Sequence, residues 1–180
     1  LFTAGIQFNA ILGNHDYEGG YNKDEMNDPR LGMGGARIYR LQSKKASVSI
    51  YMMDSVTLDL GGPQYHWLEN TARADDSRWK IFVTHKPSFA SDRGHGPSGD
   101  MQRVLRSLEA HGISFDLLLA GHNHTYERYD TPEYPAVAVT VGSSGKVDDD
   151  PWPVDENRED EYSWKEVYLV LEIDATKIVG

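Results

Sequence analysis

Leu117–Arg128 reads Leu-Leu-Leu-Ala-Gly-His-Asn-His-Thr-Tyr-Glu-Arg, an apolar run followed by a glycine and two histidines one residue apart. Four consecutive apolar residues without alternation are typical of a fully buried strand, here Leu117–Ala120. In an extended segment residues two apart face the same way, so the imidazoles of His122 and His124 share a side. Neutral imidazole is the commonest side-chain metal ligand, which makes the pair a candidate metal site. From this motif alone, two solvated loop histidines remain an open alternative.

Polar side chains of similar chemistry follow two other predicted strands. The predicted strand Ile6–Leu12 ends in Gly-Asn-His-Asp, where Asn14 offers an amide oxygen to a cation and His15 can bind a metal or shuttle a proton. The predicted strand Trp79–Thr84 delivers His85, and the proline two residues later holds the chain extended. Taken alone, Gly-Asn-His-Asp is better explained as an Asn-rich turn, but three strand ends of this kind together favour one metal-binding edge.

The remaining pattern alternates strands with helices, which predicts an α/β fold with a central sheet covered on both faces. A long surface excursion is expected over 17–37, one helix opens at Pro63, and a second is capped by Ser98 and carries an apolar stripe. The further strands are expected at 38–41, 47–54, 136–141 and 167–174, the last pairing with 177–179. At 180 residues the chain fits a single domain, 1–180. In such folds ligands bind beyond the carboxyl ends of the strands.

Composition narrows the classes of partner. The formal net charge of −10 argues against binding to a nucleic-acid backbone or an anionic membrane surface, although a metal site can reverse the sign locally. The chain has no cysteine, so disulfides and thiolate zinc sites are excluded and any metal must use His, Asn, Asp, Glu or Tyr. No apolar run reaches membrane-spanning length. The acidic segment 148–161 is interpreted as a solvated loop rather than a calcium site.

Three short blocks carry a family resemblance. Gly-Asn-His-Asp at 13–16, Thr-His-Lys-Pro at 84–87 and Gly-His-Asn-His at 121–124 resemble signature blocks of the calcineurin-like metallophosphoesterases. Tyr-Glu-Arg at 126–128 is similar to plant-type purple acid phosphatases, whereas 39–41, 53–58 and 95–97 are similar to the small mammalian-type branch. The resemblance runs from about residue 11 to residue 173.

The resemblance implies a metallophosphoesterase-type sandwich, with central mixed sheets flanked by helices, that hydrolyses phosphate monoesters at two metal ions, iron with zinc, manganese or a second iron. Two cations ~3.5–4 Å apart can clamp the attacking and leaving oxygens and activate water. The resemblance also implies that Asn14, His85 and His122 hold the more labile divalent ion and that His124 binds the other. His15 would contact the phosphate or protonate the leaving oxygen, and His95 would grip the substrate.

One departure from the family pattern matters. The blocks Asp-x-His and Gly-Asp-x-x-Tyr or -Asn, which lie upstream in the family and supply the bridging ligand, are absent from these 180 residues. We therefore expect the N-terminal part of the catalytic domain to be missing, an upstream segment to complete the site, and these residues alone to be inactive.

Two alternatives stay open: a phosphodiesterase or nucleotide-cleaving relative with the same metal core, and a non-catalytic structural module derived from a phosphatase fold. A secreted or lysosome-like location is favoured by family likeness only, and the compartment is otherwise undecided. Asn123-His124-Thr125 is a formal glycosylation sequon, which we expect to be unused because it lies between proposed ligands.

Overall fold

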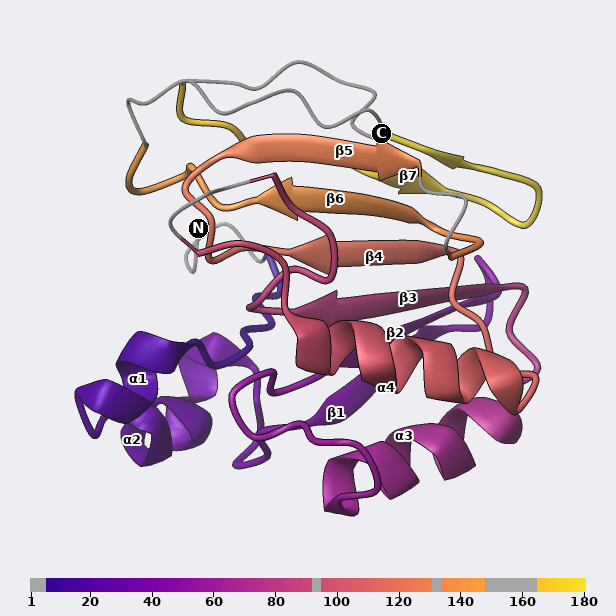
Figure 1. Cartoon of the computed structure of the whole chain (residues 1–180), viewed down its shortest axis with the longest axis horizontal. Helices are drawn as coiled ribbons and strands as arrows, with labels where there is room; N and C mark the ends of the chain where they lie inside the picture. The colour runs from indigo at the N-terminus through magenta and orange to yellow at the C-terminus, as the bar shows by residue number, and fades with distance from the viewer. Residues whose placement is uncertain (1–5, 92–94, 131–133, 148–164) are drawn as a thin grey trace.

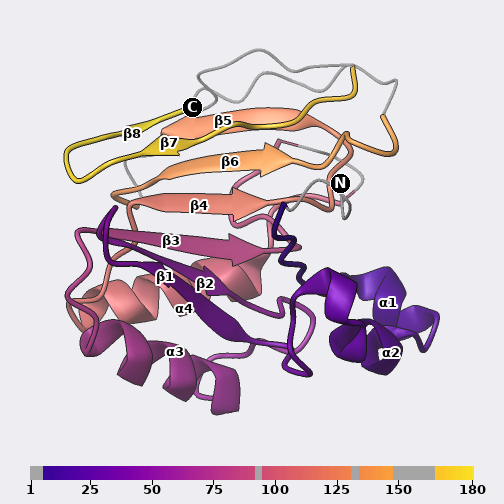
Figure 2. The same cartoon turned by 180° about the vertical axis from the view of Figure 1, so that it is seen from behind.

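A computed structural model describes residues 6–91, 95–130, 134–147 and 165–180. Its centre is a six-stranded mixed sheet in the order β1-β2-β3-β4-β6-β5 (Figures 1 and 2). The four inner strands, which are the apolar runs of the sequence, pair in parallel, and β1 and β5 close the edges as antiparallel strands. The bounds are β1 Tyr39–Ser43, β2 Val48–Met52, β3 Trp79–Thr84, β4 Leu117–Ala120, β5 Tyr126–Asp130 and β6 Val137–Val141. The expected mixed α/β architecture is confirmed.

Helices α3 (Pro63–Arg73) and α4 (Gly99–Ala110) pack on the same face of this sheet (Figure 1). Ser98 caps α4 by accepting a hydrogen bond from the Met101 N–H at 3.4 Å, as its sequence indicated. The apolar stripe of α4 is at most 1% exposed and joins Phe82 of β3 and Leu118 of β4 in the main core. Burying each such side chain contributes about 1.5–3 kcal/mol, so this layer fixes the sheet beneath it.

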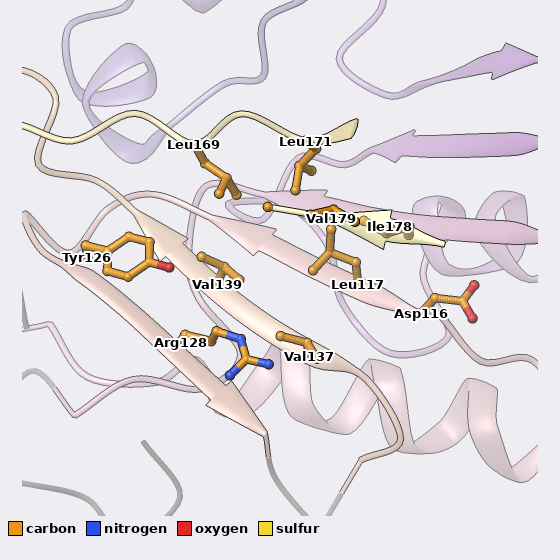
Figure 3. A pocket seen from close by; sticks show the side chains of 11 residues that line it. Asp116, Leu117, Tyr126, Arg128, Val137, Val139, Leu169, Leu171, Ile178 and Val179 are labelled. Carbon is orange, nitrogen blue, oxygen red and sulfur yellow. The ribbon is translucent and has the colours of Figure 1, made fainter. Parts of the chain in front are cut away.

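The opposite face of the sheet is apolar too, but strands cover it instead of helices. A hairpin of β7 (Glu172–Ile173) and β8 (Ile178–Val179) lies over Leu117 of β4 and Val139 of β6. Between hairpin and sheet runs a groove of about 490 Å³ (Figure 3). The hairpin with 177–179 was expected, but only two residues of the predicted strand 167–174 pair, because their partner segment is equally short.

The N-terminal region differs most from expectation. The predicted strand Ile6–Leu12 is absent because its main chain meets no sheet edge: the Ala10 N–H donates to the Leu31 carbonyl at 2.8 Å, and the Ala10 carbonyl accepts the Tyr39 hydroxyl. The expected surface loop is also partly helical. It contains the end of α1 (Asn14–Glu18), α2 (Asn22–Asn27) and a 3₁₀ turn (Pro29–Leu31).

Strand β5 was not predicted, because alternating charged side chains in Tyr-Glu-Arg-Tyr-Asp resemble a polar loop. Its pairing with β6 places Glu127 inward, where it is fully buried, and leaves Arg128 on the groove side. The acidic segment 148–161 lies outside the described residues. Among the helices that the structure describes, none is both long and apolar enough to cross a membrane.

Candidate metal centre

The carboxyl ends of β3, β4 and β6 meet at one edge of the sheet, the side on which α1 lies in Figure 1. His85 follows β3 directly, and His122 follows β4 after a single glycine. The Gly121 N–H donates to the His85 carbonyl at 3.1 Å, so the two strand ends are joined where their histidines begin. Parallel pairing thus brings side chains 37 positions apart in the sequence to one place.

Three candidate ligands converge at this edge. Asn14 Oδ1 lies 3.0 Å from His85 Nε2, and His122 Nδ1 lies 3.0 Å from the same nitrogen. A neutral imidazole nitrogen either donates one hydrogen bond or accepts one. If His85 Nε2 carries the proton, it can donate a hydrogen bond to Asn14 Oδ1 but has no lone pair that could accept one from His122 Nδ1. In the other tautomer, His85 Nε2 has no proton to donate to Asn14 Oδ1. A cation among the three atoms would satisfy all of them together.

Local backbone geometry holds the rings in this arrangement. A Cβ on Gly13 would lie 2.9 Å from the His85 ring, so only glycine lets the chain entering α1 pass that close to the imidazole. His122 has φ +68°, the left-handed region that non-glycine residues rarely adopt. Strained backbone of this kind is concentrated at functional sites, where the surrounding structure enforces it.

Both central histidines are held in the neutral, metal-binding form. Burial, and to a smaller extent the neighbouring His85, His95, Lys86 and His124, together lower the pKa of His122 to about 4. Burial also lowers the pKa of His85, against a smaller opposing effect of Asp16. An imidazole must be unprotonated to bind a metal, so at neutral pH both rings are ready to do so.

Around this trio is a cavity of about 290 Å³, whose wall includes the other candidates His15, His95 and His124. The His95 ring lies 4.6 Å from the His122 ring and 5.8 Å from the His124 ring, centroid to centroid. His15, on α1, has a side chain that is 84% exposed, and its Nδ1 lies 3.0 Å from a carboxylate oxygen of Glu18. Five of the six predicted site residues therefore line one cavity, and the sixth, Asn14, contacts His85 at its wall.

Two residues that shape the site were not predicted from the sequence. Lys146 lines the cavity from the segment after β6, and the strand-end rule applied to that strand would have pointed to it. Glu127 is the other: its buried carboxylate accepts the Ser91 N–H at 3.2 Å and the Ser91 Oγ at 2.5 Å, which fastens the start of the segment that leads to His95. Nothing in the local sequence connects residues 36 positions apart.

The donor set fits one of the two implied metal ions. Ligands about 2.0–2.1 Å from a common ion lie ~3.0–3.4 Å from one another, and His85 Nε2 lies 3.0 Å from both Asn14 Oδ1 and His122 Nδ1. Among the residues that the structure describes, no three His, Cys, Asp or Glu side chains form a metal-binding group, and the set at this edge consists of two histidines and the amide oxygen of Asn14. For the second ion the predicted set has His124 alone, which does not make a site.

The sequon lies beneath the site rather than on the surface. Asn123 and Thr125 are fully buried, and the Asn123 amide atoms have no hydrogen-bond partner within the described part of the chain. A glycan on this amide is incompatible with the folded chain.

The comparisons with known proteins agree with the fold and the site described above. The family model of the calcineurin-like phosphoesterases matches residues 1–126. Purple acid phosphatase 21 of Arabidopsis thaliana is 31% identical over 111 residues, which cover 56% of this chain and 25% of that protein. Probable purple acid phosphatase 20 of the same plant is 34% identical over 113 residues, covering 56% and 26%. The chain thus spans about a quarter of the length of these relatives.

Two solved structures share the fold. GAP50, described as the anchor in the inner membrane complex of Plasmodium, superposes over 93% of this chain and 58% of its own, with a TM-score of 0.70 and 16% identity. Purple acid phosphatase PPD1 from yellow lupin (Lupinus luteus) seeds superposes over 88% and 33%, with a TM-score of 0.55 and 15% identity. With a family model matching residues 1–126 and a mixed sheet that carries the histidine cluster at its carboxyl edge, the chain belongs to the calcineurin-like phosphoesterase family.

Proposed function

We propose that this chain forms part of a metal-dependent phosphatase that hydrolyses phosphate monoesters at a centre of two metal ions, as the purple acid phosphatases do. The observation that carries the proposal is the contact of Asn14 Oδ1, His85 Nε2 and His122 Nδ1, which no hydrogen-bonding scheme satisfies completely. We assign the whole of 1–180 to one catalytic domain. His124 is the ligand that this chain gives to the second ion, whose other ligands must come from outside this set.

The residues around the trio suit a phosphate ester. When bound, the cations would neutralise phosphate charge and lower the pKa of water. Lys146 brings a positive charge to the cavity wall. The His95 ring lies beside the rings of both His122 and His124 and lines the same cavity, where it can donate to a phosphate oxygen. His15 is exposed beside Glu18 and is placed to give a proton to the departing oxygen.

The first alternative differs from the proposed phosphatase in the leaving group of its substrate. A phosphodiesterase or nucleotide-cleaving relative would use the same three ligands, so we propose to compare p-nitrophenyl phosphate with bis(p-nitrophenyl) phosphate as substrates of the full-length protein. Preference for the monoester supports the phosphatase, and preference for the diester replaces it with the alternative.

A structural module is the second alternative, and the overlap with GAP50, whose description is that of an anchor, keeps it in view. The test is metal binding. We expect the full-length protein to bind Zn²⁺, and His85→Ala to weaken that affinity by more than the ~100-fold that a supporting contact can cost. His66→Ala removes an imidazole that is 61% exposed on α3 and should leave the affinity unchanged. Full-length protein that neither binds metal nor hydrolyses either ester would refute the enzyme and leave the structural module.

A further inference from the structure

Helix α1 carries the candidate ligand Asn14, yet none of its own side chains is buried. Its position therefore depends strongly on polar contacts with the body of the protein. Tyr17, three residues after Asn14 and on the same helix, donates a hydrogen bond from its hydroxyl to Asp54 Oδ2. Asp54 is fully buried and follows β2, so α1 is fastened to the same sheet edge that bears the histidines.

The acceptor of this bond is itself fixed. Asp54 Oδ1 accepts the Val56 N–H at 3.0 Å, and Oδ2 also accepts the Thr57 hydroxyl at 2.6 Å. From α3, the Gln64 side-chain amide donates to the Asp54 carbonyl at 3.1 Å. A carboxylate held on both oxygens cannot swing to follow Tyr17, so Tyr17 must come to it.

The next residue reaches the second ligand. Ser55 Oγ accepts the Lys86 N–H at 3.0 Å, and Lys86 is the neighbour of His85. Ser55 is 6% exposed, so water cannot readily replace this bond. Two consecutive residues of one turn therefore each hold a segment that presents a metal ligand, and the two segments are 71 positions apart in the sequence.

We propose that Asp54 and Ser55 form a positioning turn: through Tyr17 and Lys86 it sets the distance between Asn14 Oδ1 and His85 Nε2, and so tunes affinity for the metal ion without touching it. The inference rests on the proposed function, since it concerns the same site. Supporting contacts of this kind typically change metal affinity by about 10–100-fold.

The chain offers matched controls for both halves of the turn. Tyr17→Phe removes the hydroxyl and keeps the ring, and Tyr21→Phe does the same to a 63% exposed tyrosine nearby. Ser55→Ala removes an acceptor for the N–H after β3. Ser47→Ala removes its counterpart at the other end of β2, where Ser47 Oγ accepts the Arg78 N–H, also at 3.0 Å.

The experiment titrates metal-free full-length protein with Zn²⁺ by calorimetry and follows amide hydrogen exchange of residues 14–18 and 99–110. We expect Tyr17→Phe and Ser55→Ala each to weaken Zn²⁺ binding on the order of tenfold, and the two controls to bind as wild type does. In Tyr17→Phe, exchange should quicken in 14–18 and stay unchanged in 99–110.

Wild-type affinity in both Tyr17→Phe and Ser55→Ala would overturn the positioning role while leaving the proposed metal centre intact. An equal loss of affinity in the controls would also overturn it, because the effect would then be general destabilisation. Wild-type protein that binds no Zn²⁺ would remove the proposed function and this role with it.

Discussion

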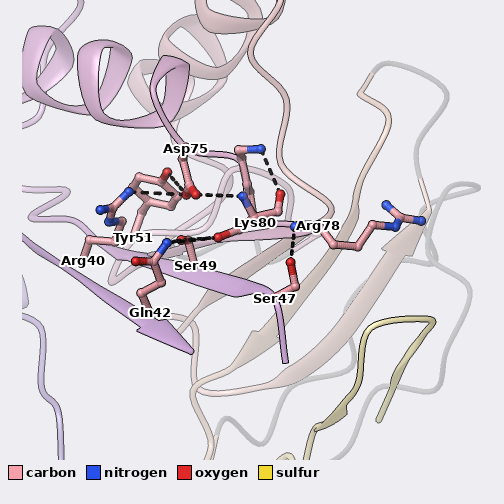
Figure 4. A network of polar contacts seen from close by, with 9 residues as sticks. Arg40, Gln42, Ser47, Ser49, Tyr51, Asp75, Arg78 and Lys80 are labelled. Atoms are coloured by element: carbon pink, nitrogen blue, oxygen red, sulfur yellow. Dashed lines mark hydrogen bonds and ion pairs between the residues drawn. The ribbon is translucent and has the colours of Figure 1, made fainter. Parts of the chain in front are cut away.

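Tyr51→Phe tests how the main helix layer is fastened to the sheet. Tyr51 is fully buried in β2, and its hydroxyl donates to Asp75 Oδ2 at 2.5 Å, just beyond the end of α3 (Figure 4). The Asp75 side chain is 0% exposed, accepts the Ser77 N–H at 2.9 Å, and lies 3.6 Å from Arg40. Phenylalanine keeps the ring and opens no cavity, so the loss is one hydrogen bond to a buried charge, about 1.5–3 kcal/mol. For a chain of this length that corresponds to a melting point lowered by about 3–12 °C.

The acceptor's charge gives this prediction a pH signature. Burial alone would raise the pKa of Asp75, but hydrogen bonds from Ser49, Tyr51 and Ser77 outweigh it and hold the pKa well below the ordinary 3.8. The stabilisation is therefore fully present above pH 3.8 and is lost as the pH falls through the lower, folded-state value. Removing the hydroxyl raises that folded-state value, so the difference between wild type and Tyr51→Phe should be full at pH 7 and no larger at pH 3.

The assay is urea unfolding of both proteins at each pH, with Tyr65→Phe as control. Tyr65 is 4% exposed, but its hydroxyl meets the neutral Ser107 hydroxyl at 2.8 Å, where a bond contributes about 0.5–1.5 kcal/mol. If Tyr51→Phe lowers the free energy of unfolding no more than Tyr65→Phe does, or by a larger amount at pH 3 than at pH 7, the buried charge of Asp75 does not fasten α3.

Three further predictions concern the core, the site and its underside. Leu105→Ala, in a side chain that is 1% exposed, should lower the free energy of unfolding by about 2–5 kcal/mol, measured by urea titration. Because the pKa of His122 falls from 6.5 to about 4 on folding, metal-free protein should lose stability as the pH drops from 6.5 to 4; His122→Asn should flatten that slope in the same titration. Asn123 should stay unmodified in protein from a glycosylating host, because its amide is buried; mass spectrometry would detect a glycan.

Most of the secondary structure could be predicted from local sequence patterns. The inner strands β2, β3, β4 and β6 are short apolar runs, and the α4 helix has a capping serine and a stripe of period 3.6, so both follow from residues close in sequence. The same rules failed where the secondary structure depends on pairing with residues distant in the sequence. Ile6–Leu12 has strand-like residues but finds no strand to pair with, and β5 has loop-like residues but lies beside β6.

What the sequence alone determined is which side chains have ligand chemistry, Asn14, His85, His122 and His124, and that a strand ends just before His85 and another just before His122. Tertiary structure decided that three of these meet at 3.0 Å, that Lys146 joins their cavity, and that Asp54 and Ser55 hold two of the ligand segments in place. The physical reason is distance along the sequence. Strand and helix periodicity act over a few residues, whereas a metal site depends on sheet register and on hydrogen bonds between residues tens of positions apart. Those contacts exist only once the parallel strands have paired.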